Sequence, residues 1–388
     1  MKGKIYVILI LTFVFYCTFI ARIIFAPLLP VVVKDLGLSY TLSGAIFMWV
    51  SLGLLVSSVL SGILSYMLPL RVLVLSASFG VGTTLFAGFL IKGITHVYAV
   101  SFFVGLFAGL YLSAGIAIIT SIIDKAYWGK ALSIHELAPN LSFVSAPFIA
   151  ELLLRLMNWR SILLLIGLCG ILSGLLFWWK GEGGEKRAQG RAGASFVSIL
   201  KRREFWLMAV LFGLGVGAAM GVFSMLPLFL VEEKGLENRE ANYWVGFSRM
   251  FAVGAAFLSG YLTDRVGYKR VIFSVMCLAG VSSVFLGILP KGSVFMFVVL
   301  QPFFAQAFFP AGFSALSNMS DQQERAMMVG LTIPVGVLIG AGGFPWFIGF
   351  VGDRLSLRIG LIFVGILIAS GALISTKLAS KGKQLGNL

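Results

Sequence analysis

The chain has 388 residues, of which 59% are hydrophobic and 12% are charged, and its formal net charge at pH 7 is +15. Since a soluble globular domain has about 25% charged residues, this composition excludes that class and indicates a protein that crosses a membrane many times. The basic residues are spread among the loops, so the charge indicates membrane topology and not a nucleic-acid partner.

The first half of the chain contains six apolar segments, each long enough to cross a bilayer at a rise of about 1.5 Å per residue. They cover residues 5–33, 41–68, 72–91, 98–123, 131–156 and 161–179. Residues 181–203 are rich in glycine and in charged side chains, and they predict a cytoplasmic linker. Six further apolar segments follow, at residues 205–231, 241–262, 271–289, 294–317, 327–351 and 357–377. The sequence therefore predicts an all-α membrane protein with about twelve transmembrane helices in two pseudo-symmetric six-helix bundles, 1–180 and 204–388.

An even number of spans places both ends of the chain on one side of the membrane. Lys2 and Lys4 near the start, and Lys381 and Lys383 near the end, predict that this side is the cytoplasm. We expect a monomeric, multi-pass protein of the cell inner membrane or plasma membrane. The cysteines lie far apart within apolar segments, so we expect no disulfide framework, no metal site and no cofactor: they are Cys17, Cys169 and Cys277.

A dense charge cluster at residues 260–270 lies between two apolar segments, and it predicts a tight turn between two membrane helices. Gly267 permits the turn, and the basic residues beside it place the turn in the cytoplasm. The pattern recurs about 200 residues earlier, at Gly62 and Arg71. Such a long repeat in an apolar chain predicts two halves related by an axis along the membrane normal.

Two six-helix halves, a long middle loop and the spacing within this turn resemble the major facilitator superfamily of secondary transporters, over nearly the whole chain. The turn matches the loop signature of that family at Gly260, Leu262, Asp264, Arg265, Gly267 and Lys269. Shorter supporting matches are Gly129-Lys130-Ala131-Leu132, Asn158-Trp159-Arg160, and Gly349 with Asp353-Arg354. The first-half loop departs from the signature, because the acid, the following arginine and the turn glycine are replaced by Tyr66, Met67 and Pro69.

The resemblance implies a gating role for this turn, with Asp264 facing the cytoplasmic start of the fifth helix near residues 127–130. Free backbone N–H groups and the helix dipole favour a carboxylate there by about 0.3–1 kcal/mol. The contact requires the two halves to close on the cytoplasmic side, so it would act as a latch that favours the outward-open state. The alternative is that Asp264 pairs with Arg265 or Lys269 within the turn.

Few ionisable side chains fall well inside the predicted spans. Among them, Arg22 and Arg249 lie toward the middle of the bilayer, where an arginine that faces lipid costs at least about 2.5–3.5 kcal/mol. They must therefore face a water-filled cavity or a carboxylate. A guanidinium offers a fixed fork that matches carboxylate or phosphate oxygens, so we predict that these arginines bind an anionic substrate. The alternative is an internal ion pair, for instance between Arg22 and Glu136.

Glu136 is the predicted proton carrier, because Pro139 just beyond it loosens the helix and burial would let the carboxylate take up a proton. His135 is the second proton-coupling candidate, although it points about 100° away around the helix and is more typical of a helix end. Gln301 and Gln306 are the predicted hydrogen-bonding residues of the substrate cavity.

These features predict a secondary active transporter that moves a small organic anion of the carboxylate type by alternating access, coupled to protons or in exchange for another anion. The alternative is efflux of amphipathic drugs in exchange for protons. Drug antiporters of the family carry a glycine-rich Gly-Pro motif in the fifth helix, and the nearest match, Ala146-Pro147-Phe148, lacks the flanking glycines. The sequence displays neither a catalytic cluster nor a phosphate-binding loop, so we expect neither an enzyme nor an ATPase.

Overall fold

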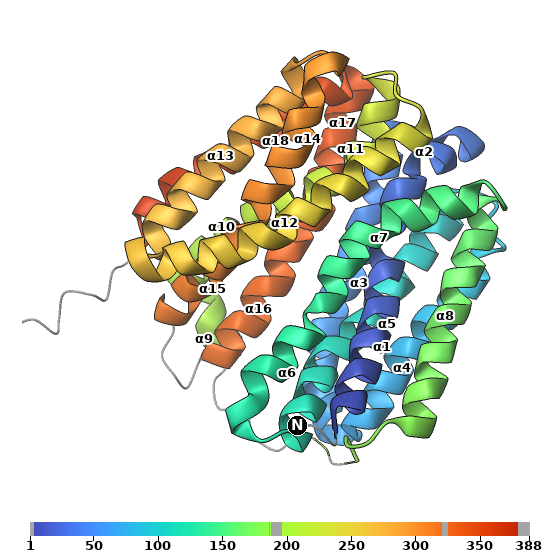
Figure 1. Cartoon of the computed structure of the whole chain (residues 1–388), viewed down its shortest axis with the longest axis vertical. Helices are drawn as coiled ribbons and strands as arrows, with labels where there is room; N and C mark the ends of the chain where they lie inside the picture. The colour runs from blue at the N-terminus through green and yellow to red at the C-terminus, as the bar shows by residue number, and fades with distance from the viewer. Residues whose placement is uncertain (1–3, 186, 188–195, 320–324, 379–388) are drawn as a thin grey trace, which may run out of the picture.

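The computed structural model describes residues 4–185, 187, 196–319 and 325–378, and these fold into helices joined by short connections (Figure 1). The first half consists of α1 (Ile5–Ile23), α2 (Phe25–Leu36), α3 (Tyr40–Met67), α4 (Leu70–Gly88), α5 (Ile94–Ile122), α6 (Trp128–His135), α7 (Leu137–Leu154) and α8 (Trp159–Lys180). The second half consists of α9 (Phe196–Leu200), α10 (Arg203–Val216), α11 (Val222–Glu232), α12 (Asn238–Val266), α13 (Tyr268–Ile288), α14 (Lys291–Gln306), α15 (Phe308–Met319), α16 (Arg325–Val337), α17 (Phe344–Arg354) and α18 (Leu357–Thr376). Residues 186 and 188–195 of the predicted linker, together with Lys2, Lys381 and Lys383, lie outside the described residues.

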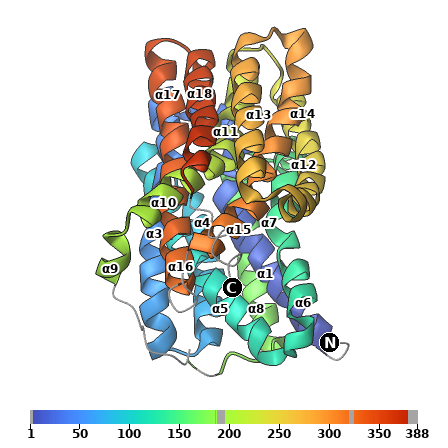
Figure 2. The ribbon, with the colours of Figure 1, turned by 90° about the vertical axis from the view of Figure 1, so that its left-hand side faces the viewer.

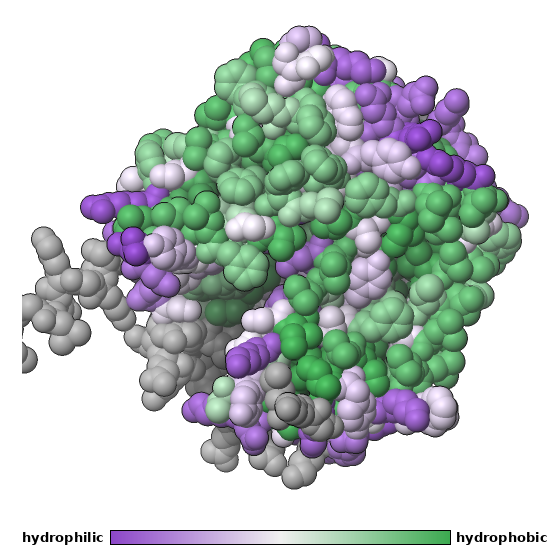
Figure 3. Space-filling model, viewed as in Figure 1, coloured by the Kyte–Doolittle hydropathy of each residue, from purple (hydrophilic) through white to green (hydrophobic). Residues whose placement is uncertain are grey.

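The described part of the chain contains 12 helical segments that are long and apolar enough to cross a membrane. Each predicted apolar segment corresponds to one of them, so the predicted all-α fold with about twelve spans is confirmed. Several spans are built from two consecutive helices, as α1 and α2 are. The surface of the molecule is hydrophobic over a broad middle region, and hydrophilic residues gather mainly toward the helix ends (Figure 3).

Proline causes the break between α6 and α7. Pro139 has no N–H group, so the carbonyl of His135, four residues earlier, has no helical partner, and α6 ends there. The Asn140 side chain donates to the next carbonyl, that of Glu136, at 3.1 Å. The break between α14 and α15 bears the same relation to Pro310. Sequence thus determines where these spans change direction.

The two halves lie side by side, and their helix ends define two faces of the molecule (Figures 1 and 2). We call the face with the chain N-terminus, the end of α8 and the α12–α13 turn the linker face, and the face with the α2–α3 and α11–α12 turns the far face. Gly267 alone forms the α12–α13 turn, with φ at 86°, a conformation that L side chains rarely adopt. The tight turn that the sequence predicts at this position is present.

Candidate functional site

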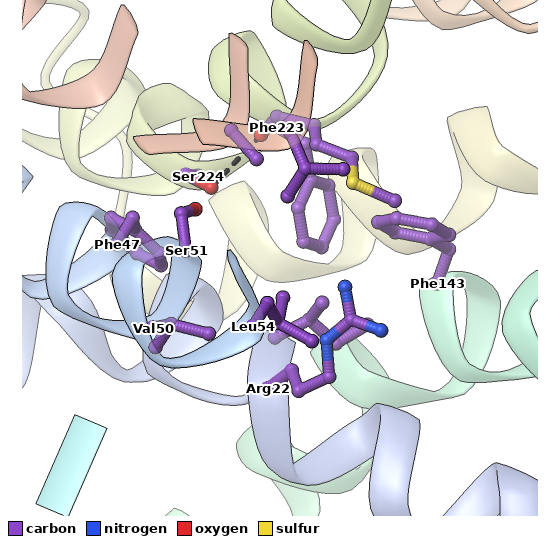
Figure 4. Close-up of a pocket in the computed structure, with 12 residues that line it drawn as sticks. Arg22, Phe47, Val50, Ser51, Leu54, Phe143, Phe223 and Ser224 are labelled. Carbon is purple, nitrogen blue, oxygen red and sulfur yellow. Dashed lines mark hydrogen bonds between the residues drawn. The ribbon is translucent and has the colours of Figure 1, made fainter. Parts of the chain in front are cut away.

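A small cavity of about 30 Å³ lies between the two halves, and Arg22 forms part of its wall (Figure 4). Residues of α1, α3 and α7 line it from the first half. Residues of α11, α16 and two π-helical segments, η3 (Gly217–Gly221) and η4 (Leu338–Gly343), line it from the second half. Besides Arg22, Ser51 and Ser224, the lining residues are apolar: Ile23, Phe47, Val50, Leu54, Phe143, Met220, Phe223, Val337 and Ala341. A solute bound here would touch both halves at once.

Arg22 lies in the last turn of α1, directly before the break at Ile24. Its guanidinium carbon lies 4.6 Å from the centroid of the Phe19 ring. Its Nε is buried without a hydrogen-bond partner, and no described carboxylate forms an ion pair with this side chain. The alternative ion pair with Glu136 is not formed, because the Glu136 carboxylate lies 3.5 Å from His135 Nδ1 instead.

Arg249, on α12 in the other half, is only 3% exposed and lies behind two rings of the cavity wall. Its Nη2 donates to the Ala219 carbonyl at 2.9 Å. Its guanidinium carbon lies 4.5 Å from the centroid of Phe223 and 5.1 Å from that of Phe143, and both rings line the cavity. The Arg249 Nε is also buried without a partner, and no described carboxylate pairs with it. Both arginines therefore keep unused hydrogen-bond donors at the junction of the two halves.

Three phenylalanine rings connect the two guanidinium groups. Phe143 meets Phe19 edge-on with a centroid distance of 5.4 Å, and it meets Phe223 edge-on at 5.1 Å. The ring faces attract cations, and each such contact contributes about 0.5–2 kcal/mol. They stabilise the guanidinium charges in part but do not neutralise them. Sequence reasoning missed these rings, and with 35 phenylalanines in the chain no signal in the sequence distinguishes them.

The π-helical segment η3 supplies the carbonyls that orient the second half of this site. A π-helical turn interrupts the regular α-helical bonding pattern. The Ala219 carbonyl accepts from Arg249, and the Ala218 carbonyl accepts from Gln301 Nε2 at 2.8 Å. Gln301 is fully buried, and neither it nor Gln306 lines the cavity. The structure thus places the two predicted glutamines outside the cavity wall, with Gln301 holding η3 in position.

The two predicted proton-coupling residues lie at the break between α6 and α7. The expected burial of Glu136 is wrong: its side chain, at the break itself, is 54% exposed. His135 ends α6 but is fully buried, and its ring stacks on Phe15 with a centroid distance of 4.7 Å. Its Nε2 lies 3.0 Å from the Tyr111 hydroxyl, which itself donates to the Leu11 carbonyl at 2.5 Å. The histidine is therefore the more enclosed member of the pair.

The predicted gating turn is exposed at the linker face. Asp264 forms no hydrogen bond or ion pair with any described residue. The Arg265 guanidinium lies 4.6 Å from the ring of Tyr261 and does not pair with Asp264. Lys269 is not bonded to Asp264 either, and Gly260 lies one turn earlier on α12. This conformation therefore contains neither the predicted latch nor the alternative pairing within the turn.

The far face, by contrast, is closed by contacts between the halves. The Asp353 carboxylate, near the end of α17, accepts from the backbone N–H groups of Tyr40 at 2.7 Å and Thr41 at 2.9 Å. It thereby caps the start of α3 in the other half. Gly349 approaches so closely that an added Cβ would lie 2.0 Å from the Tyr40 carbonyl oxygen. A side chain at this position would push the halves apart.

Further hydrogen bonds join the halves near this face. Asn242 on α12 donates to the Pro27 carbonyl at 3.2 Å, and Arg155 donates to the Tyr243 hydroxyl at 3.0 Å. On the other side, the surface is hollowed between the halves toward the linker face (Figure 3). The molecule is therefore closed at the far face and open toward the linker face.

Two acidic residues at the interface between the halves, Glu151 and Asp353, were not among the functional residues predicted from the sequence. Glu151, near the end of α7, is only 6% exposed, and its carboxylate lies 3.5 Å from Arg155 Nε. Asp353 was noted only as part of a motif fragment. The signal for its role was available, because Gly349 and Asp353-Arg354 repeat the spacing of the Gly260 turn.

The chain is similar to known transport proteins in sequence and in fold. A family model described as Major Facilitator Superfamily matches residues 11–300. The probable nitrate/nitrite antiporter NarK1 of Thermus thermophilus is 27% identical over 216 residues, which cover 51% of this chain and 47% of that protein. The match thus spans about half the length of this curated relative.

Two solved structures have the same fold. A bacterial homologue of the human lysosomal transporter Spinster, in an inward-facing and unoccupied conformation, is 16% identical, with a TM-score of 0.83 over 97% of each chain. A variant of the nucleoside transporter NupG is 12% identical, with a TM-score of 0.80 over 96% of this chain and 100% of its own. At these identities the likeness concerns the fold alone.

Proposed function

Because the chain belongs to the major facilitator superfamily, we propose that it is a secondary transporter that carries a small organic anion of the carboxylate type by alternating access. We place both termini in the cytoplasm, which makes the linker face cytoplasmic, and we take the working unit to be a monomer in the cell membrane. The transported anion binds between the halves, at the cavity that Arg22 lines, with Arg249 behind the Phe143 and Phe223 rings of its wall.

The observation that carries this proposal is the pair of arginines that no carboxylate of the described residues neutralises. An arginine in the middle of a membrane costs at least about 2.5–3.5 kcal/mol, and it normally points to water or to a partner. Among the described residues, the partners of Arg249 are a neutral carbonyl and aromatic rings, and the partner of Arg22 is an aromatic ring. An anionic substrate supplies the missing charge, and a guanidinium can hold a carboxylate through two parallel hydrogen bonds.

Alternating access would use two carboxylates at opposite faces, each capping a helix of the other half in one of the two states. Asp353 caps α3 when the far face is closed, as it is here. Asp264 would cap the start of α6 when the linker face is closed, with Gly260, Arg265, Gly267 and Lys269 shaping its turn. One geometry excludes the other, so the two latches stabilise opposite states of the transporter.

Proton coupling, where it operates, would use His135 together with Glu136. Tyr111 has one hydroxyl proton, which it gives to the Leu11 carbonyl, so His135 Nε2 must donate to the Tyr111 oxygen. The neutral ring then has a free lone pair on Nδ1, which faces the Glu136 carboxylate at 3.5 Å. A proton taken up from the linker face would lie between these two groups. Exchange of one anion for another requires no such step.

Two other classes of substrate are alternatives to an organic anion. The name of the Thermus thermophilus relative favours a nitrate or nitrite ion as the second candidate anion. Efflux of lipophilic cations is the third candidate. Arg22 in the cavity wall and Arg249 behind it oppose this function, because a cation would be repelled there.

A thermal-shift screen of the purified full-length protein tests the proposal. A ligand that binds only the folded state increases the free energy of unfolding, by about 2.7 kcal/mol at a hundredfold excess over its Kd, and therefore raises the melting temperature. We expect stabilisation by short carboxylates and none by lipophilic cations. Stabilisation by nitrate alone would move the inorganic ion to first place, and stabilisation by lipophilic cations alone would contradict an anion site.

A further inference from the structure

The cavity has a second polar region, formed by two serine hydroxyls from opposite halves. Ser51 on α3 is 2% exposed and has no hydrogen-bond partner among the described residues. Ser224 on α11 also lines the cavity, and its hydroxyl donates to the Met220 carbonyl at 2.9 Å, which leaves its oxygen lone pairs available. Both hydroxyls lie on the same side of the cavity, away from the Arg22 guanidinium (Figure 4).

The packing around Ser51 keeps this hydroxyl in place. Gly342, in η4, lies against it, since an added Cβ there would be 3.0 Å from the Ser51 Cβ and 3.1 Å from its Oγ. The Ser51 hydroxyl borders the cavity and bonds to none of the described residues, so it is free to bond to a solute there. Between the serines and Arg22 the walls are apolar, with Val50 and Leu54 among them.

We infer that the substrate is a short-chain monocarboxylate with one further hydroxyl group: its carboxylate binds Arg22, and its hydroxyl accepts a hydrogen bond from Ser51 and donates one to Ser224. This inference rests on the proposed function and narrows it. A dicarboxylate is disfavoured because its second charge would meet hydroxyls and no cation. An unsubstituted acid leaves Ser51 without a partner. The small size of the cavity favours an acid with a short chain.

Lactate and propionate test the inference, because they differ only by the 2-hydroxyl group. In the purified full-length protein we expect lactate to bind about tenfold more tightly than propionate. Ser51→Ala should reduce this ratio to near one by weakening lactate and leaving propionate unchanged. Ser51→Thr keeps a hydroxyl and should retain part of the ratio. Ser57→Ala, on the same helix but outside the cavity wall, is the matched control and should leave the ratio at its wild-type value.

The outcomes separate this inference from the proposal that it rests on. Equal affinity of the wild-type protein for both acids, or an unchanged ratio in Ser51→Ala, overturns the inference, while binding of both acids that Arg22→Ala abolishes would still support an anion site. Absence of binding by either acid overturns both, as does binding of nitrate alone. The wild-type ratio requires no variant, so a poorly folded serine variant does not prevent a decision.

Discussion

The closed far face allows a quantitative prediction for Asp353. Its carboxylate accepts two backbone hydrogen bonds, at 2.7 and 2.9 Å, from the start of a helix in the other half. Hydrogen bonds to a charged group contribute about 1.5–3 kcal/mol each, but the site is exposed and water competes, so we take that range for the pair together. At about 1.4 kcal/mol per factor of ten, Asp353→Asn should shift the equilibrium between the two states by roughly ten- to a hundredfold toward the open far face.

Distances between spin labels measure this shift. Labels at Leu156 and Glu237, exposed positions near the far face in opposite halves, report its opening in a background without the native cysteines. Glu232→Gln is the matched control, because this acid touches the same Tyr40 through a single long hydrogen bond of 3.3 Å. A distance distribution for Asp353→Asn that matches both the wild type and this control would refute the latch.

Three further predictions concern other parts of the chain. Asp264→Asn should populate the state that is open at the linker face still further, by a few-fold, and spin labels on α6 and α12 that report unchanged distances would contradict this. Glu136→Gln should abolish proton-driven accumulation of substrate while exchange continues in proteoliposomes; loss of exchange as well would make Glu136 a structural residue. Lys234 is 7% exposed, and this burial lowers the pKa of its ammonium group below the usual 10.5. Because the folded state then releases its proton first, the free energy of unfolding should rise with pH up to about 10.5, and denaturant titrations of Lys234→Met should lack this rise.

The fold was largely predictable because a membrane imposes length and apolarity on every span. The breaks within spans were less predictable. Residues 5–33 form one apolar segment in the sequence, but in the structure the chain there forms two helices, divided near Ile24. Pro139 predicts the break at Glu136. The direction of the Glu136 side chain, however, depends on tertiary packing. For this reason the depth of Glu136 along the chain did not reveal its exposure.

The candidate site was predictable only where a charge stands out in an apolar segment. Arg22 and Arg249 were found in this way, and the structure brings both against the same row of phenylalanines. Gln301 was expected in the cavity and instead bonds to the Ala218 carbonyl, because η3 departs from the α-helical pattern that sequence reasoning assumes. Ser51 is one serine among many, and only its position in three dimensions distinguishes it.

Transport of a radiolabelled short carboxylate, with Arg249 variants in proteoliposomes, tests the central claim most directly. Lys92→Ala removes a positive charge from an exposed loop and serves as the matched control. The anion site predicts that Arg249→Ala weakens binding and uptake by at least about tenfold, and that Arg249→Lys recovers only part of the loss, because the bidentate fork is gone. Undiminished affinity in well-folded Arg249→Ala, or transport of lipophilic cations that improves when this charge is removed, would contradict the claim.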